Sequence, residues 1–472
     1  MDLKRIKHIH FTGIKGVGMT ALALCAQDLG KKVTGSDTDE VFPTDTILKQ
    51  RKINLKIGFS SKNLPKKCDL VIYTGAHGGS TNPEVVEAVK QNIPVLSHAK
   101  ALALFINNQK TLAVAGVGGK SSTSAMLATI LDHNGYQPSF AIGVGNIDPL
   151  NTPGRFNKKS NYFVVEADEY VTDPLKDQTP RFHHLNPFHA IITNIEHDHP
   201  DVYPSLKSMI NSFTAFVANV PKDGLVIANI DNPNVKTFLQ KIDKPVATYG
   251  FSPQADWQII KTHIADKKQF FKLKFKNMDL PDFILDVPGE YNALNAVAAI
   301  ASSYNLGLSF DKIRAGLKKF KGTKRRFEYI GEAKNIELYD DYAHHPIEIQ
   351  ALLKAAKNWL PHKKVIAIFQ SHTYSRTKTL LQEFSQSFKH AHTILINDIF
   401  ASAREKDNLG LTGEIFTKSV KNYSYNTHYC AGKKETLKFL KKYATKDNVI
   451  FTIGAGDNWL WHKDILKTLR QK

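Results

Sequence analysis

Residues 113–127, AVAGVGGKSSTSAML, join a glycine-lined turn to a lysine and a run of hydroxyl side chains. The turn follows an apolar run typical of a strand and precedes a helical pattern that ends at Gly135. A helix N-terminus offers unpaired N–H groups and the positive end of a dipole, and both suit a phosphate. Lys120 can reach terminal phosphates, and the hydroxyl after it can bind Mg²⁺. The pattern predicts a shortened nucleotide-phosphate loop, because Val114 stands where the usual P-loop has a glycine.

A second glycine loop, HFTGIKGVGM at residues 10–19, also lies between a strand pattern and a helical pattern. Its order, G-x-x-G-x-G, is similar to a dinucleotide fingerprint and fits a diphosphate at a helix N-terminus. The next strand ends at Gly35-Ser36-Asp37, which would place Asp37 near a ribose or a base. For both glycine loops, the competing interpretation is an ordinary tight turn between a strand and a helix.

Two acidic constellations follow predicted strands. Glu166, Asp168 and Glu169 end the run YFVVEADE, and the stretch TNIEHDH at 193–199 follows the strand after it. Carboxylates at the carboxyl ends of strands face the ligand crevice of an α/β sheet, where their oxygens can bind Mg²⁺. Alternatively, both stretches are polar loops that bind nothing. Their occurrence beside Lys120 favours metal binding.

Other polar side chains fall at fixed spacings. Asn292 and Asn295 share one face at the start of a helical pattern, where amides can pair with an adenine edge. Alternatively, they cap a core helix. KRRFE, DDYAHHP and FQSHTYSRT follow in the last third of the chain. An arginine there can bind a γ-phosphate, and an aspartate can bind ribose hydroxyls.

The elements that must position these side chains alternate between strand and helix. Strands are predicted at HIHFTG, VIYTGA, TLAVAG, YFVVEA, AIITNI, LVIAN, VIAIFQ, TILIND and VIFTIG, with amphipathic helices between many of them. This alternation predicts an α/β fold with parallel sheets. Polar residues 106–110 and basic residues 318–328 suggest boundaries, which give three domains at 1–107, 108–320 and 321–472.

Composition excludes several classes of protein. The chain has 472 residues, 42% of them hydrophobic and 23% charged, and no apolar run approaches the length of a membrane helix. The three cysteines form no CxxC pair, and no signal peptide is evident, so we expect a cytoplasmic protein without membrane insertion. The net charge of +19 is spread along the chain, which argues against nucleic acid as a partner.

Taken together, these motifs resemble the Mur ligase family over nearly the whole chain. The resemblance rests on GKSST, EADE, TNIEHDHPDVY, the helix NALNAVAA, KRRFE, DDYAHHP and FQSHTYSRT. It implies three domains: a Rossmann-like UDP-binding domain, a central P-loop-like ATPase domain and a C-terminal Rossmann-like domain that closes over the substrates. It also implies ATP and Mg²⁺ as cofactors and a monomer or homodimer. The GIKGVGM loop, FQSHTYSRT and SAREKD are similar to the alanine-adding members, whereas EADEY and RFHHLNPF are similar to those that attach a recycled tripeptide.

The reaction implied is ATP-dependent ligation of L-alanine to the lactyl carboxylate of UDP-N-acetylmuramate through an acyl phosphate, in peptidoglycan synthesis. The resemblance also implies residue roles. The catalytic set would be Lys120, Glu166, His199, His372 and Arg376. ATP would contact Gly116, Gly118, Gly119, Lys120, Ser121, Ser122, Asn292, Asn295, Arg326 and Asp341. The UDP substrate would contact Gly13, Gly16, Gly18, Met19, Ser36 and Asp37, and the metal would bind Ser121, Glu166 and His199.

Several positions depart from the family pattern. Lys15 replaces a glycine, Val117 and Gly118 replace a Thr-His pair, Tyr291 replaces a histidine, and Thr373 replaces an arginine. These departures leave other functions open: the tripeptide ligase, or a scaffold that binds nucleotide without turnover. A dehydrogenase would explain only the first glycine loop.

Overall fold

The computed structural model describes residues 1–106, 108–199, 201–401, 405 and 407–471. The chain divides into two compact units. The first contains Met1–His263, Phe270–Asp286 and Asn292–Thr323, and the second contains Ile264–Gln269, Val287–Tyr291 and Lys324 onward. The expected boundary at 107 lies inside the first unit, at a residue outside the described ranges, and the one at 320 lies near the end of that unit.

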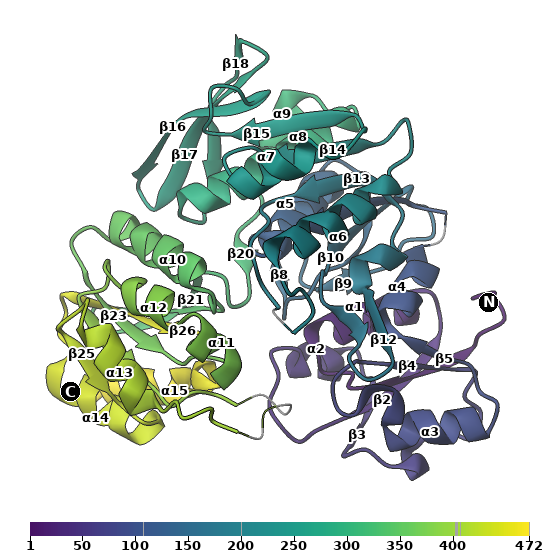
Figure 1. The fold of residues 1–472 in the computed structure, drawn as a ribbon, viewed down its shortest axis with the longest axis horizontal. Helices are drawn as coiled ribbons and strands as arrows, with labels where there is room; N and C mark the ends of the chain where they lie inside the picture. The colour runs from purple at the N-terminus through teal and green to yellow at the C-terminus, as the bar shows by residue number, and fades with distance from the viewer. Residues whose placement is uncertain (107, 200, 402–404, 406, 472) are drawn as a thin grey trace. The chain divides into compact units, whose positions relative to one another are not determined.

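The chain begins with a five-stranded parallel sheet in the order β3-β2-β1-β4-β5, drawn in purple and blue in Figure 1. Its strands are β1 (His8–Thr12), β2 (Lys32–Asp37), β3 (Asn54–Ile57), β4 (Leu70–Tyr73) and β5 (Val95–Ser97). Its helices are α1 (Val17–Asp28), α2 (Asp45–Gln50), α3 (Pro83–Lys90) and α4 (His98–Ile106). The strands β1 and β4 are buried along their whole length, as continuous apolar runs in parallel sheets usually are. This sheet therefore has the expected Rossmann-like character.

The middle part of the chain forms a larger sheet in the order β18-β17-β16-β15-β14-β13-β6-β10-β7-β9, with β19 beside β17. Its central strands are parallel: β6 (Lys110–Ala115), β7 (Ser139–Ala141), β10 (Tyr162–Ala167), β13 (Pro187–Ile192), β14 (Leu225–Asn229) and β15 (Val246–Gly250). Its outer strands are β9 (Gly154–Arg155), β16 (Trp257–Ala265), β17 (Lys268–Phe275), β18 (Met278–Asp279) and β19 (Phe283–Leu285). The expected strands at the centre are confirmed, and β16 to β19 were not predicted.

Helices and two small ribbons accompany this sheet (Figure 1). The helices are α5 (Lys120–His133), α6 (Leu206–Ala218), α7 (Pro233–Leu239), α8 (Glu290–Asn305) and α9 (Phe310–Leu317). The ribbons pair β11 (Val171–Asp173) with β12 (Asp177–Pro180) and β8 (Ile147–Asp148) with β20 (Gly322–Thr323). One hydrophobic core runs from α1 of the first sheet to β6, β10 and β13 of the second. The two sheets of the first unit therefore share a packed interface, across which the Cys25 thiol donates to the Phe140 carbonyl oxygen.

The second unit contains a six-stranded sheet in the order β21-β22-β26-β23-β24-β25, in which only the β21–β22 pair is antiparallel. The strands are β21 (Glu328–Ala333), β22 (Ile336–Asp341), β23 (Lys364–Phe369), β24 (Thr393–Ile396), β25 (Thr427–Tyr429) and β26 (Asn448–Ile453). The helices are α10 (Pro346–Trp359), α11 (Tyr374–Thr379), α12 (Leu381–Gln386), α13 (Gly413–Lys421), α14 (Lys433–Tyr443) and α15 (His462–Arg470). The α/β prediction with parallel sheets is confirmed. Within the described ranges, no helix is both long and apolar enough to span a membrane.

Candidate active site around the phosphate loop

The predicted phosphate loop lies between β6 and α5, as the sequence pattern requires. Gly116 and Gly119 have φ values of 134° and 85°, which L side chains rarely adopt. A Cβ atom at Gly119 would collide with the Asn295 side chain, and one at Gly116 would collide with Thr193 and Asn194. The glycines are therefore needed both for the turn and for close packing. Ser121 and Ser122 follow in the first turn of α5 and are buried.

Side chains from the end of β13 hold the peptide groups of this loop in place. The Gly118 N–H donates to Oδ1 of Asn194 at 3.0 Å. The Gly118 carbonyl oxygen accepts from Nδ2 of Asn194 at 3.0 Å and from the Thr193 hydroxyl at 2.6 Å. Because both the N–H and the carbonyl oxygen of Gly118 are bonded, the loop keeps its shape without the Thr-His pair of the family pattern.

The Lys120 side chain folds back over the loop and pairs with an acid. Its Nζ donates to the Gly116 carbonyl oxygen at 2.6 Å and lies 3.0 Å from Oε2 of Glu169. Burial alone would lower the pKa of Lys120, but the carboxylates of Glu169 and Asp168 outweigh it and raise that pKa. The lysine is therefore a fixed positive charge in the loop. A nucleotide phosphate would compete with Glu169 for this ammonium.

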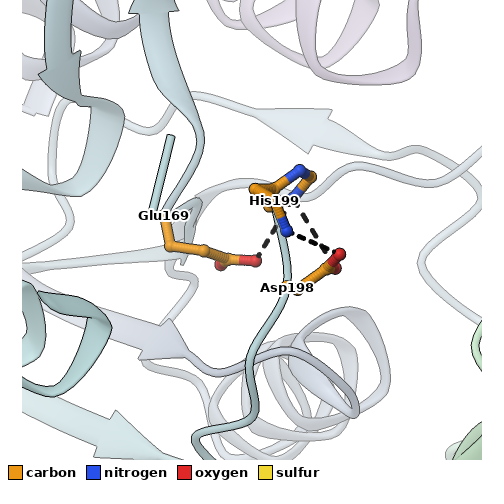
Figure 2. Close-up of side chains that lie close together, drawn as sticks. All are labelled: Glu169, Asp198 and His199. Carbon is orange, nitrogen blue, oxygen red and sulfur yellow. Dashed lines mark hydrogen bonds and ion pairs between the residues drawn. The ribbon is translucent and has the colours of Figure 1, made fainter. Parts of the chain in front are cut away.

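A metal-binding set lies next to this ion pair. Glu169, Asp198 and His199 each offer a ligand atom, and these atoms lie within 4.8 Å of one another. Figure 2 shows the His199 ring facing both carboxylates, with Nε2 at 3.8 Å from Glu169 and 3.7 Å from Asp198. Tyr170 packs against the ring of His199, with centroids 4.6 Å apart. Two carboxylates and an imidazole fit a divalent cation, and oxygen donors suit Mg²⁺.

Glu166 is the next-to-last residue of β10 and occupies a different position from Glu169. Its Oε1 accepts from the Gly143 N–H at 2.8 Å. The structure thus gathers His199 with Glu169 and Asp198, while the predicted metal set was Ser121, Glu166 and His199. The assignment of metal ligands within this group remains a prediction.

The neighbouring Asp168 has a structural partner. It lies 2.6 Å from Nη1 of Arg181. Although burial opposes ionisation, the arginine and Lys120 lower the pKa of Asp168 to about 2. The acid is therefore charged and bound to Arg181 at neutral pH.

The predicted adenine amides lie at the start of α8. Nδ2 of Asn295 donates to Oδ1 of Asn292 at 3.3 Å, and both residues are buried. Asn295 packs on Gly119 of the phosphate loop. The pair therefore supports one wall of the loop, and contact with adenine remains a prediction.

In the first sheet, the glycine loop joins β1 to α1. Gly13 has φ 75° and its N–H donates to the Ser36 carbonyl oxygen, while Gly16 precedes the first turn of α1. Gly18 lies in that turn and faces the His98 ring. The Asp37 carboxylate ends β2 and accepts the N–H groups of Lys15 and Thr38. Burial raises the pKa of Asp37 despite these bonds.

Two predicted substrate contacts in this region have their side chains in the interior. Met19 belongs to the hydrophobic core. The Ser36 hydroxyl donates to Glu84, a fully buried acid. These side chains stabilise the domain, and direct contact with a substrate remains a prediction.

The remaining predicted residues lie in the second unit. Arg326 stacks on the Tyr342 ring at 5.4 Å. Asp341 accepts the N–H groups of Phe327 and Ala343, and burial raises its pKa to about 6. Arg326 lies just before β21, and Asp341 is the last residue of β22.

His372 and Arg376 lie around the start of α11. The His372 ring packs against Phe400 with centroids 5.9 Å apart. Thr373, at φ 72°, bonds through its hydroxyl to the Arg376 N–H. Within SAREKD, residues 402–404 and 406 lie outside the described ranges, whereas Glu405 accepts the Tyr374 N–H at 2.6 Å.

The residue roles implied by the family resemblance did not include Glu169, Asp198, Thr193 or Asn194, although the sequence marked the stretches that contain them as candidate metal-binding constellations. The signals were present, because all four lie inside EADE and TNIEHDH. What the sequence lacks is the distance between side chains from different strands. That distance separates Glu169, beside Lys120, from Glu166, beside Gly143.

Comparison with known proteins finds matches along nearly the whole chain. Models of the Mur ligase family match the chain at residues 8–110 (catalytic domain), 114–303 (middle domain) and 325–456 (glutamate ligase domain). A UDP-N-acetylmuramate–L-alanine ligase from Caldanaerobacter subterraneus subsp. tengcongensis is 38% identical, over 97% of this chain and 96% of the relative. One from Desulfitobacterium hafniense is 35% identical over 95% and 97%.

Solved structures of related ligases share the fold of this chain. The UDP-N-acetylmuramate-alanine ligase MurC of Thermotoga maritima has a TM-score of 0.82 and 26% identity, covering 99% of this chain and 100% of that one. A murein peptide ligase from Psychrobacter arcticus has a TM-score of 0.71 and 26% identity, covering 99% of each chain. With matches to all three domain models and relatives above a third identical along almost its entire length, this chain belongs to the Mur ligase family.

Proposed function

We propose that the protein ligates L-alanine to the lactyl carboxylate of UDP-N-acetylmuramate, using ATP, in peptidoglycan precursor synthesis. The observation that carries this proposal is the phosphate loop with Lys120 paired to Glu169, next to a three-residue metal set. The full-length relatives are named as ligases of this reaction. We place the reaction in the cytoplasm. We assign the chain three domains, at about 1–107, 108–320 and 321–472.

The first step transfers the γ-phosphoryl group of ATP to the lactyl carboxylate and gives an acyl phosphate. Both reactants are anionic, so the site must neutralise charge and align groups. Lys120 binds the β- and γ-phosphates, and the N–H groups at the start of α5 face the phosphate chain. Ser121, Glu166 and His199, with Glu169 and Asp198 beside them, would hold Mg²⁺, which would supply positive charge to neutralise the transferring phosphoryl group. Asn292 and Asn295 contact adenine.

The second step is attack of the alanine amine on the acyl phosphate carbonyl. A new C–N bond forms, and phosphate leaves with the former carboxylate oxygen. His372 and Arg376 orient the alanine and the lactyl group, and Arg326 and Asp341 contact the γ-phosphate and the ribose. The first domain binds the UDP moiety at Gly13, Gly16 and Gly18, where backbone N–H groups suit a diphosphate.

Phosphate release from ATP and Mg²⁺ tests this proposal. The protein is incubated with UDP-N-acetylmuramate and, in separate tubes, L-alanine, L-serine, glycine or the murein tripeptide. Release that requires both UDP-N-acetylmuramate and L-alanine is the expected result. Release with the tripeptide alone would assign the protein to the recycling reaction. Absence of release with every amine, despite ATP binding, would make it a scaffold.

A further inference from the structure

Lys15 lies in the glycine loop of the first sheet and is only 4% exposed, although lysine is among the residues least often buried. Burying an ammonium costs free energy unless hydrogen bonds and opposite charges compensate. The family pattern has a glycine at this position, so the chain carries a buried charge that the fold does not require. Its contacts therefore show what the charge does.

Those contacts tie the glycine loop to residues 38–45, the segment between β2 and α2 together with the first residue of α2. The Lys15 Nζ donates to the Glu40 carbonyl oxygen at 2.7 Å and lies 3.7 Å from the Asp45 carboxylate. The Lys15 carbonyl oxygen accepts from the Thr44 hydroxyl. The Phe42 ring lies 5.7 Å from Nζ. Lys15 is thus held along the whole segment, from Glu40 to Asp45.

The same segment touches the middle sheet. Pro43 packs on Gly145 so closely that a Cβ atom there would lie 2.8 Å from the proline Cβ and 3.2 Å from its carbonyl oxygen. Gly145 belongs to the turn after β7, and two residues earlier the Gly143 N–H donates to Oε1 of Glu166 at 2.8 Å. Lys15 is therefore linked to Glu166 through residues 38–45, the contact of Pro43 with Gly145, and the hydrogen bond from Gly143 to Glu166.

We propose that Lys15 is a positioning residue that couples the nucleotide loop of the first sheet to the Glu166 carboxylate of the metal site. By fixing residues 38–45, it holds Pro43 against Gly145 and so sets where the Gly143 N–H places Glu166. A glycine at position 15 has no side chain to make this tie. The inference rests on the proposed function for the role of Glu166. By linkage, a change at Lys15 alters Mg²⁺ binding and substrate binding together.

The test measures the Mg²⁺ concentration that half-saturates ATP binding, by calorimetry without UDP-N-acetylmuramate or any amine. Lys15→Met and Lys15→Gly are expected to raise this concentration about three- to tenfold. Lys15→Arg keeps the charge and a hydrogen-bond donor, so its half-saturating Mg²⁺ concentration is expected to stay close to that of the wild type. The KM for UDP-N-acetylmuramate is then measured for the same variants, and it is expected to rise in the variants whose half-saturating Mg²⁺ concentration rises.

Lys31→Met is the matched control. The Lys31 ammonium also binds backbone carbonyl oxygens, those of Leu3 and Ile6 at 2.6 and 2.7 Å, but at the opposite end of the first sheet. The thermal midpoint of Lys31→Met is expected to fall as in Lys15→Met. Its half-saturating Mg²⁺ concentration, however, is expected to stay at the wild-type value. This separates positioning from general destabilisation.

Two outcomes would overturn the inference: an unchanged Mg²⁺ requirement in Lys15→Met, or an equal increase in Lys31→Met. Because the Mg²⁺ requirement is read from ATP binding, it remains measurable if the wild-type protein turns over no amine. In that case the proposed function fails, but the Mg²⁺ dependence of ATP binding still tests the coupling between Lys15 and Glu166. Loss of Mg²⁺-dependent ATP binding in the wild-type protein would contradict both.

Discussion

The two glycine loops of the first unit are stabilised in different ways. In the middle sheet, the loop at 116–119 is held by side chains from other elements: Thr193 and Asn194 on the Gly118 peptide and Asn295 against Gly119. In the first sheet, the Asp37 and Thr44 side chains also bind the loop at 13–18, but the loop adds an anchor of its own, the Lys15 ammonium, which donates to the Glu40 carbonyl oxygen.

The difference concerns where each loop keeps its charge. Lys120 faces the site and pairs with Glu169, and a phosphate can replace that carboxylate as the partner of the ammonium. The charge of Lys15 is used inside the protein, on a backbone carbonyl oxygen and Asp45. A lysine in a glycine loop is therefore proposed to bind a ligand in one case and to tie two segments of the protein together in the other.

The largest effect is expected from Lys120→Ala, which removes the cation that faces the phosphates. We expect kcat to fall about 100- to 1,000-fold, as for the loss of a charge-stabilising group. Lys110→Ala is the control, because Lys110 begins the same strand and stacks on Phe188 at 3.8 Å, at the end away from the loop. Steady-state phosphate release measures both. Equal activity of Lys120→Ala and the wild type would remove the loop from the mechanism.

The two glutamates of EADE are expected to differ from the aspartate between them. Glu169→Gln and Glu166→Gln should each raise the Mg²⁺ concentration for half-maximal activity about 10- to 100-fold, because each removes a charged oxygen near the cation. Asp168→Asn should leave it within about twofold, since that side chain is bound to Arg181. A Mg²⁺ titration of the three variants decides this. If only Asp168→Asn shifts the requirement, the metal site is misplaced.

Two glycines at the ends of α5 test how far the phosphate loop depends on close packing. Gly119 and Gly135 have similar φ values, 85° and 80°, but a Cβ at Gly119 meets Asn295 whereas one at Gly135 meets open space. Gly119→Ala should weaken ATP binding about tenfold, while Gly135→Ala should only lower stability by about 1–2 kcal/mol. Calorimetry and thermal unfolding distinguish the two effects. Equal ATP affinities in both variants would contradict the packing argument.

The smallest effect concerns Glu84, a buried acid in the domain of the first sheet. Burial opposes ionisation of Glu84, but hydrogen bonds from His10, Ser36 and Asn63 outweigh it and lower its pKa. The stability that its charge contributes is therefore present above the ordinary value of 4.5 and is lost as the pH falls through the lowered pKa.

Glu84→Gln should therefore lower the free energy of unfolding by about 1–3 kcal/mol at pH 7. The difference from the wild type should shrink as the pH falls below about 4.5. Urea unfolding from pH 7 to pH 3 measures this. A difference that grows toward low pH would mean that Glu84 is neutral in the folded protein.

The features that depend on short-range pattern could be predicted from the sequence. The nine predicted strands exist, and the GKSST loop lies between β6 and α5 because an apolar run, glycines and a helix former follow one another directly. The family followed from motifs that are contiguous in sequence, and it is confirmed.

Features set by tertiary contacts could not be predicted in this way. Glu166 and Glu169 are three residues apart, and only packing determines that Glu169 meets Lys120 and His199. From the sequence, Lys15 is only a replacement for the family's glycine, since nothing near it in sequence shows that Glu40 and Asp45 enclose its ammonium. The strands from β16 to β19 were missed, although WQIIKTHIA is rich in the β-branched residues typical of strands.

The central claim is that this site activates a carboxylate by phosphoryl transfer. Its most direct test uses UDP-N-acetylmuramate labelled with ¹⁸O in the lactyl carboxylate, together with ATP, Mg²⁺ and L-alanine. An acyl phosphate requires the labelled oxygen to leave with the phosphate, so mass spectrometry should find ¹⁸O in the inorganic phosphate released. Phosphate released without the label would show that ATP is hydrolysed by water, and would contradict the account.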